Sequence, residues 1–302
     1  MNTVSERISK RAQETRNDTA AILADLVRIP SFSGDEEAVC RRIEEICREI
    51  GFDEVWIDGF GSVVARLGTG PRILAFDAHV DTVGVGDRKQ WELDPFSGLI
   101  REGKVFGRGS ADQKGGAAAM LAAARILKEI GVDDGLSVYF TFTVLEEDCD
   151  GLCWKYLIEE EGIFPEYVVS TEPTSCRLYR GHRGRMEMRA EFRGVSAHGS
   201  APERGESAAY KVARAALALE RLNTELEPDR FLGKGTVVVS EVGANGPSQC
   251  AVPDQGFLYI DRRLTWGETA EMAIEQVRNS IGADVGDVAM PVFTKRGWRG
   301  LD

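Results

Sequence analysis

The stretch PRILAFDAHVD, residues 71–81, predicts the central element of the fold. It is mostly apolar, which predicts a β-strand in the middle of a sheet that is covered on both faces. The stretch ends in two polar residues, His79 and Asp81. Side chains two residues apart on a strand share a face, so we expect Asp81 to hold the imidazole ring of His79.

Helices and strands alternate on both sides of this stretch, and residues 53–68 have the pattern of a β-hairpin. Apolar residues recur at helical spacing in residues 11–29, 35–51, 115–131 and 149–162, and further strands are expected at 136–148 and 165–173. Alternation of this kind predicts an α/β fold with a doubly wound, largely parallel sheet.

The pattern changes from about residue 184. Strands are expected at 185–194, 235–243, 254–264 and 287–293, and helices at 206–226 and 269–282. The order β-α-β-β-α-β is that of a ferredoxin-like α+β module. We therefore predict a catalytic, metal-binding domain over residues 1–182 and an inserted ferredoxin-like lid and dimerisation domain over 183–294. Residues 295–302 are expected to begin the return to the catalytic domain, which is incomplete in this chain.

Charge and composition exclude several classes of protein. The net charge of −12 argues against a nucleic-acid partner, because phosphate binding needs clustered Lys and Arg. No apolar run is long enough to predict a membrane span, and the polar N-terminus lacks the apolar core of a signal peptide. The six cysteines are scattered, which favours free thiols in a reducing, cytoplasmic compartment. A metal site at Cys149 and Cys153 is the weaker alternative, since no second pair completes it.

Acidic residues follow the other predicted strands of the first domain. Asp112 lies in the turn GRGSADQKGG, Glu146 and Glu147 end the segment 136–148, and Glu172 ends the segment 165–173. Ligands of open α/β sheets bind beyond the carboxyl ends of the strands. Carboxylates gathered there repel one another unless a cation neutralises them. One His with several carboxylates suits Zn²⁺, Co²⁺ or Mn²⁺.

The neighbouring Glu146 and Glu147 are expected to divide two tasks. If the backbone stays extended, their side chains point to opposite sides, so that one binds metal while the other acts as a base. A carboxylate shared by two ions would hold them about 3.5–4 Å apart. Taken singly, a Glu-Glu pair is usually solvated surface and an Asp in a Gly-rich turn usually serves the turn. The placement of all these groups at strand ends favours a metal site.

Several stretches together resemble the M20 metallopeptidase and aminoacylase family. They are FDAHVDTV, WELDPFSG, GRGSADQKGG, VLEEDCDG, STEPT and GVSAHGSAPERGESA, in this order along nearly the whole chain. The sequence around CDGLCW, STEPT, HGSAPERG and IDRRLTWGE is most similar to that of the selenium-metabolism-linked hydrolases within the family. The resemblance implies a metal-dependent hydrolase of amide bonds in small N-acyl amino acids or peptide-like substrates.

The resemblance also implies a role for each acidic residue and for His79. Asp112 would bridge two metal ions, and the peptide bond after it would be cis. His79 and Glu172 would bind the first ion and Glu147 the second, Asp81 would orient His79, and Glu146 would be the general base.

Two residues of the second domain complete the implied site. His198, in GVSAHGS, would reach the active site of a neighbouring subunit and stabilise the oxyanion, which implies a homodimer formed through the lid domain. Such a dimer would form if an exposed edge strand paired with the same strand of a second copy. Arg263, in the family's Asp-x-Arg pattern, would hold a substrate carboxylate.

The sequence departs from the family in its histidines. The family has one further His ligand for the second metal on a C-terminal segment, whereas this sequence contains only His79, His182 and His198 and stops at RGWRGLD. We therefore expect a truncated chain that binds the second metal weakly or not at all. The alternative function is a catalytically impaired protein that forms dimers or binds ligands. Cys250 replaces an Asn of many relatives, and His182 fits no ligand position.

Overall fold

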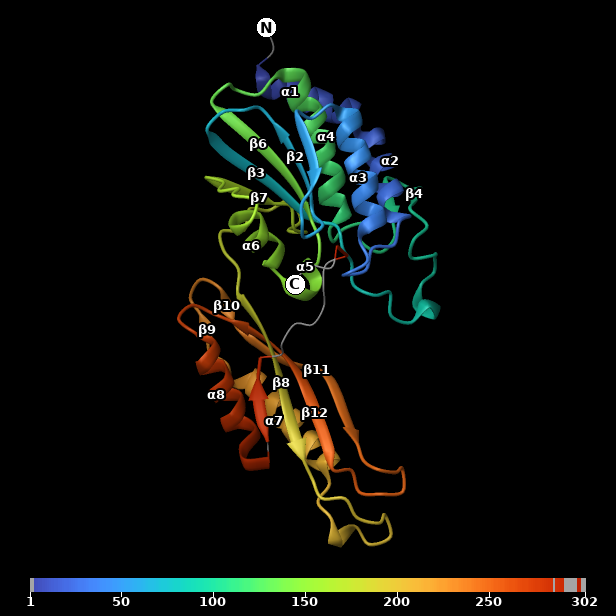
Figure 1. The fold of residues 1–302 in the computed structure, drawn as a ribbon, viewed down its shortest axis with the longest axis vertical. Helices are drawn as coiled ribbons and strands as arrows, with labels where there is room; N and C mark the ends of the chain where they lie inside the picture. Colours follow the sequence, from blue (N-terminus) through green and yellow to red (C-terminus); the bar gives the residue numbers. More distant parts are fainter. Residues whose placement is uncertain (1–2, 285, 291–297, 300–302) are drawn as a thin grey trace. The chain divides into compact units, whose positions relative to one another are not determined.

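The computed structural model describes residues 3–284, 286–290, 298 and 299, which divide into two compact units (Figure 1). The first unit runs to Arg177 and also includes Trp298 and Arg299. The second unit begins at Leu178. The chain thus leaves the first unit once and comes back to it.

A mixed five-stranded sheet forms the centre of the first unit. The stretch 71–81 forms β3, with β6 and β7 as its parallel neighbours, which confirms the predicted α/β fold. The predicted hairpin, β1 and β2, adds two antiparallel strands beyond β6. In spatial order the strands are β1 (Glu54–Ile57), β2 (Val63–Leu67), β6 (Leu136–Thr143), β3 (Arg72–His79) and β7 (Tyr167–Ser170).

Helices pack on both faces of this sheet. The helices are α1 (Val4–Glu14), α2 (Arg16–Val27), α3 (Glu37–Ile50), α4 (Lys114–Ile130), α5 (Glu146–Cys149) and α6 (Leu152–Glu159). The single helix expected over 11–29 is two helices that meet at Thr15. A short 3₁₀ helix (Arg88–Gln90) and a small hairpin of β4 (Leu99–Arg101) and β5 (Lys104–Phe106) lie between β3 and α4 in the sequence.

The main core lies between the sheet and the helices α3 and α4. Val138, Phe140 and Phe142 alternate along β6 and are buried in it, because side chains at every second position of a strand share a face. The other face of the sheet carries a smaller cluster that includes Val64 and, from α6, Leu157. This two-sided burial explains why the central strands are mostly apolar.

The second unit has the strand order of a ferredoxin-like module. Its sheet has the order β11-β12-β8-β13 with antiparallel pairing throughout, and its elements follow one another as β-α-β-β-α-β. They are β8 (Gly184–Arg193), α7 (Ala208–Glu225), β11 (Thr236–Asn245), β12 (Gln255–Leu264), α8 (Ala270–Ile281) and β13 (Asp287–Ala289). A two-residue pair, β9 (Pro228–Asp229) and β10 (Gly233–Lys234), stands apart from this sheet. The last part of the strand predicted at 287–293 falls outside the described residues.

In the described part of the chain, no helix has the combination of length and apolarity that crossing a membrane requires.

Replacing Phe140 with alanine is expected to destabilise the first unit by about 3–5 kcal/mol, because the fully buried ring leaves a cavity. The ring contacts Phe52 and Phe76, each with centroids 5.3 Å apart. Urea unfolding followed by circular dichroism measures the loss. The matched control is Phe164→Ala, whose side chain is exposed in the same unit. Equal unfolding midpoints for the two variants would contradict this account of the core.

Candidate metal centre

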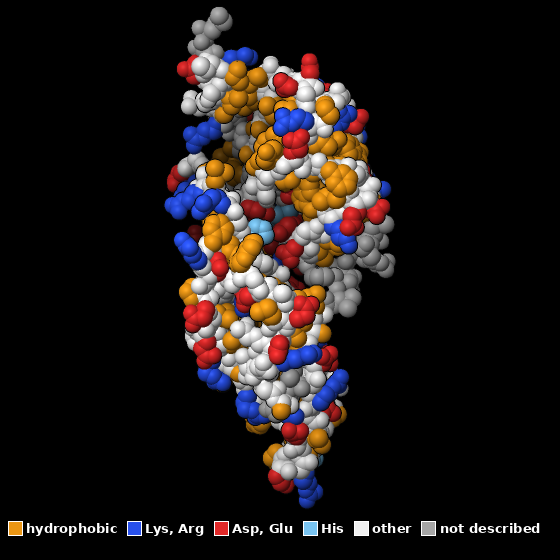
Figure 2. All heavy atoms as spheres, turned by 90° about the vertical axis from the view of Figure 1, so that its left-hand side faces the viewer, with side chains coloured by type: hydrophobic (Ala, Val, Ile, Leu, Met, Phe, Trp, Pro, Cys, Tyr) orange, Lys and Arg blue, Asp and Glu red, His pale blue; other side chains and the backbone are white. Residues whose placement is uncertain are grey.

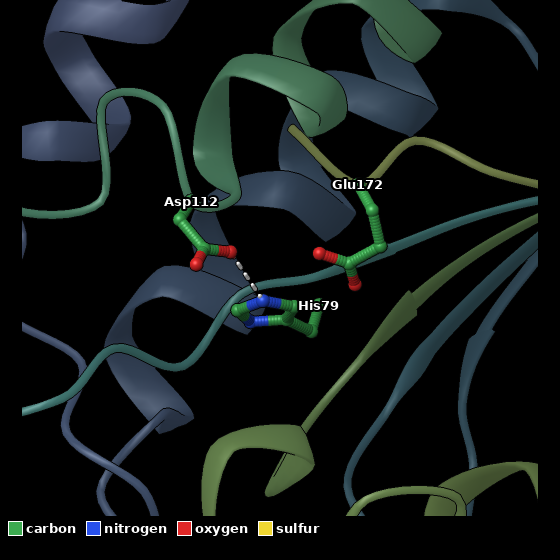
Figure 3. Close-up of side chains that lie close together, drawn as sticks. All are labelled: His79, Asp112 and Glu172. Carbon is green, nitrogen blue, oxygen red and sulfur yellow. Dashed lines mark hydrogen bonds and ion pairs between the residues drawn. The ribbon is translucent and has the colours of Figure 1, made fainter. Parts of the chain in front are cut away.

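Three side chains meet at the carboxyl ends of the parallel strands (Figure 3). His79 is the last residue of β3, Glu172 follows β7 by two residues, and Asp112 precedes α4. One possible ligand atom from each lies within 4.8 Å of the others, and the Nε2 atom of His79 is 3.0 Å from Oδ1 of Asp112. Figure 2 shows acidic side chains gathered in a recess of the surface. One imidazole and two carboxylates are donors that suit Zn²⁺ and similar divalent ions.

Close packing of α4 brings Asp112 and Glu172 together. Gly116, in the first turn of α4, has no side chain, and a Cβ atom there would collide with the hydroxyl of Thr171. That hydroxyl lies 2.9 Å from Oε1 of Gln113, the residue after Asp112. The Asp112–Gln113 peptide bond is cis, as the family resemblance implies.

The start of α4 is also anchored to the end of α2. The amine of the buried Lys114 donates hydrogen bonds to the main-chain oxygens of Leu26, at 3.1 Å, and Ile29, at 2.7 Å. Burial lowers the pKa of this amine to about 8. Lys114 thus holds the segment that carries Asp112, a role that the sequence interpretation missed.

Asp81 controls the orientation of the histidine ring. The Nδ1 atom of His79 lies 3.1 Å from the main-chain oxygen of Asp81 and 3.4 Å from its Oδ1 atom. An N–H donated to Asp81 leaves the Nε2 atom, which faces Asp112, as the possible ligand. The geometry therefore suits the predicted pairing of the two side chains.

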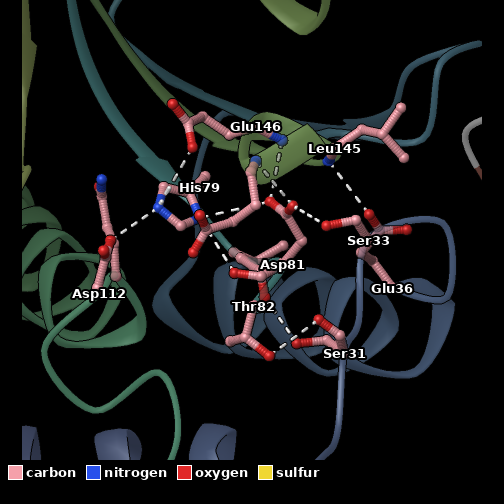
Figure 4. Close-up of polar contacts among 12 residues, drawn as sticks. Ser31, Ser33, Glu36, His79, Asp81, Thr82, Asp112, Leu145 and Glu146 are labelled. Carbon is pink, nitrogen blue, oxygen red and sulfur yellow. Dashed lines mark hydrogen bonds and ion pairs between the residues drawn. The ribbon is translucent and has the colours of Figure 1, made fainter. Parts of the chain in front are cut away.

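The same carboxylate accepts hydrogen bonds from a turn that follows β6 (Figure 4). Its Oδ1 accepts the N–H of Glu146 and its Oδ2 accepts the N–H of Glu147, both at 3.1 Å, and Oδ2 also accepts the hydroxyl of Ser33 at 2.7 Å. A side-chain oxygen of Glu36 accepts the N–H of Leu145 at 3.1 Å. We call Leu145, Glu146 and Glu147 the 145–147 turn.

The backbone of the 145–147 turn differs from the expectation. Leu145 is left-handed, with φ 63° and ψ 25°, and Glu146 begins the single helical turn α5. The extended backbone from which opposite directions of Glu146 and Glu147 were inferred is therefore absent. The Oε2 atom of Glu146 is 3.9 Å from Nε2 of His79, whereas the group of three possible ligands does not include Glu147. The predicted role of Glu147 at a second ion stays a prediction.

Burial and neighbouring charges shift the pKa values of several groups in the site. Burial alone would lower the pKa of His79, but its contacts with Asp112 and Asp81 outweigh burial and raise that pKa to about 11. Burial raises the pKa of Glu146 to about 7 and also raises the pKa of Glu172. Burial opposes ionisation of Asp81 as well, yet its contacts with His79 hold its pKa below the usual value. Without an ion, a proton on His79 therefore neutralises part of the acidic cluster.

The other predicted site residues belong to the second unit. The Nδ1 atom of the exposed His198 lies 2.8 Å from the hydroxyl of Ser200. Arg263, on β12, donates from Nε to Oδ1 of Asp261 at 2.8 Å and from a terminal nitrogen to Oδ2 at 3.1 Å. His182 is exposed and lies beside the main-chain oxygen of Arg183. Cys149 and Cys153 form no disulfide and lie outside the group of three possible ligands.

A histidine and carboxylates gathered at the ends of parallel strands are typical of metal-dependent α/β enzymes. The model for peptidase family M20/M25/M40 matches residues 75–253, and the chain belongs to this family. It is therefore a hydrolase that acts on C–N bonds of peptides or amides.

Two relatives illustrate the range of sequence similarity. The chain is 48% identical over 296 residues to an uncharacterized protein, YgeY, of Escherichia coli K12, covering 97% of this chain and 73% of the relative. It is 32% identical over 287 residues to a succinyl-diaminopimelate desuccinylase of Cereibacter sphaeroides, covering 89% of this chain and 74% of that enzyme.

Solved structures share the fold. The dipeptidase Dug1p of Saccharomyces cerevisiae superposes with a TM-score of 0.71 at 15% identity, covering 91% of this chain and 75% of Dug1p. Human carnosine dipeptidase 1 has a TM-score of 0.68 at 14% identity, covering 96% of this chain and 80% of the dipeptidase. At such identities the likeness concerns the fold alone.

Binding of a divalent ion is expected to release about one proton at pH 7, because His79 must lose its proton to become a ligand. The pKa of His79 is raised, so the ion-free ring stays protonated well above neutral pH. Affinity should therefore rise with pH, by about tenfold per unit between pH 6 and 8. Zn²⁺ titrations by calorimetry in two buffers of different ionisation enthalpy measure the release.

The variant His182→Gln serves as the control, since His182 lies outside the ligand group. It should release the same proton as the unaltered protein. A binding heat that does not depend on the buffer would contradict the proposed protonation of His79.

Proposed function

We propose that this chain hydrolyses the amide bond of small N-acyl amino acids or peptide-like substrates that bear a carboxylate. The observation that carries the proposal is the position of the Glu146 carboxylate, 3.9 Å from His79 and next to the ligand group. The similarity to desuccinylases, whose name describes removal of an acyl group, supports an N-acyl substrate.

The donor set fits the metal ion that the family implies. His79, Asp112 and Glu172 would hold Zn²⁺, with Co²⁺ or Mn²⁺ as alternatives, and Glu147 would contribute to a second ion. When bound, such an ion acidifies water and polarises the carbonyl group of the substrate. Asp81 keeps the Nδ1 side of His79 occupied, so that Nε2 remains the ligand.

Glu146 is the proposed general base. Burial raises the pKa of this carboxyl group above its usual value, which makes it a stronger acceptor for a proton of the attacking water. The same group then donates that proton to the leaving amine, which avoids release of an unstable amide anion.

Residues of the second unit would complete the site. His198 would stabilise the oxyanion in the active site of a neighbouring copy, as the family resemblance implies. Arg263 would hold the carboxylate of the substrate, and its two hydrogen bonds to Asp261 keep the guanidinium group oriented. The free thiols of all six cysteines are compatible with a cytoplasmic location.

The variant Glu146→Ala is expected to lower kcat by about 10²–10⁴-fold, because the proton acceptor is lost. Bound zinc should remain, since the three proposed ligands are untouched. Turnover of N-acyl amino acids and dipeptides, together with zinc content by mass spectrometry, tests both points. Glu160→Gln, an exposed carboxylate of the same unit, is the control. Full turnover by Glu146→Ala would remove Glu146 from the mechanism.

A homodimer formed through the second unit is the proposed assembly. The strand β11 lies at the edge of its sheet and exposes Val238 and Val242. An uncovered edge strand with apolar side chains can pair with a second copy.

Replacing both Val238 and Val242 with glutamate is expected to convert the dimer to a monomer, because like charges would face each other across the two-fold axis. Light scattering after size-exclusion chromatography measures the mass. Met272→Glu changes an exposed residue of α8 and should leave the dimer intact. A wild-type protein that is monomeric at micromolar concentration would overturn the proposed assembly.

A further inference from the structure

A second buried acid, Glu36, contacts the turn that carries the proposed base. Glu36 precedes α3 and its side chain is fully buried. Its Oε1 atom accepts the N–H of Gly34 at 2.9 Å and the N–H of Leu145 at 3.1 Å. The latter bond joins residues 109 positions apart in the chain (Figure 4). Glu36 therefore connects the segment after α2 with the start of the 145–147 turn.

The conformation of Leu145 makes this contact important. Leu145 is buried and left-handed, a backbone conformation that non-glycine residues rarely adopt. Such a conformation persists only where the surroundings hold it. In the described chain, the N–H of Leu145 is bonded to Glu36 rather than to a main-chain oxygen. A buried N–H without an acceptor would favour a different backbone.

Two acids from different segments thus accept three successive N–H groups of the turn. Glu36 accepts that of Leu145, and Asp81 accepts those of Glu146 and Glu147. These bonds fix where α5 begins and therefore the direction in which the Glu146 side chain leaves the backbone. A base must lie within hydrogen-bond reach of the proton that it removes. A small rotation of this turn would move the Glu146 carboxylate out of that reach and lower the rate.

We propose that Glu36 is a positioning residue for Glu146, through its hydrogen bond to the N–H of Leu145. The inference rests on the proposed function, because it assumes that Glu146 is the base. Glu36 does not belong to the possible metal ligands, and its contact with the turn is to the backbone N–H of Leu145.

The contact needs an acceptor oxygen at one place, and it does not need a charge. A single oxygen, Oε1, accepts both N–H groups, while Oε2 is buried without a hydrogen-bond partner among the described residues. A glutamine side chain can place its carbonyl oxygen where Oε1 lies. An aspartate is one methylene shorter and cannot reach both donors from the same backbone. A leucine removes the acceptor and leaves two N–H groups unpaired.

Three variants of the full chain loaded with zinc test the proposal. Kinetics use N-acetyl-L-alanine, N-succinyl-L-lysine and L-alanyl-L-alanine as probes. Glu36→Leu and Glu36→Asp should lower kcat by about 100-fold with KM and zinc content unchanged, as expected for a misplaced catalytic group. Glu36→Gln should retain most of the kcat of the wild-type protein. The exposed neighbour supplies the control, Glu37→Gln, which should behave as wild type.

Hydrogen exchange gives a readout that does not depend on turnover. The amides of residues 145–147 should exchange at least about tenfold faster in Glu36→Leu and Glu36→Asp than in Glu36→Gln, because the turn opens more often. Unchanged exchange in the leucine and aspartate variants would overturn the proposal. If Glu36→Leu fails to fold, the comparison of aspartate with glutamine decides the question.

The two proposals fail in different ways. Loss of turnover in Glu146→Ala with unchanged kcat in Glu36→Asp would refute only the positioning role. Turnover retained in Glu146→Ala would refute the proposed base, and faster exchange in Glu36→Asp would then still show that Glu36 holds the turn.

Discussion

The buried carboxylate of Asp81 is the contact on which the candidate metal centre depends. It faces the imidazole of His79 and accepts hydrogen bonds from Ser33, Glu146 and Glu147. A buried charge is stable only when it is paired and hydrogen-bonded, so the Asp81 carboxylate requires these partners. Asp81 therefore helps to orient both the possible metal ligand and the proposed base.

Electrostatic balance explains the rest of the site. Burial and neighbouring carboxylates raise the pKa of Glu146 and Glu172, and the positive charge of a protonated His79 partly offsets this effect. A divalent cation bound to His79 would replace this proton and take over its role in the charge balance.

The sequence predicted the parts of this arrangement that depend on local patterns. The apolar run before His79 predicted the central strand. The acids near the strand ends were predicted to gather at one edge of the sheet, and Asp112 and Glu172 do lie beside His79 there, whereas Glu147 is not in that group. The break between α1 and α2 at Thr15 was not predictable, because no Gly or Pro marks it. The left-handed Leu145 was missed for a similar reason, since leucine is not a residue that signals a turn. Ser33 and Glu36 contact partners that lie 48 and 109 positions away in the chain. The spacing of residues in the sequence does not predict contacts at such separations.

The return of the chain to the first unit has a practical consequence. The indole N–H of Trp298 donates to the main-chain oxygen of Gly61, and a terminal nitrogen of Arg299 donates to the oxygens of Ile57 and Asp58. Gly61 has no side chain, and a Cβ atom there would occupy the space of the indole ring. In a variant that lacks the other four tryptophans, the emission of Trp298 would therefore report whether the ring stays against the hairpin or enters water.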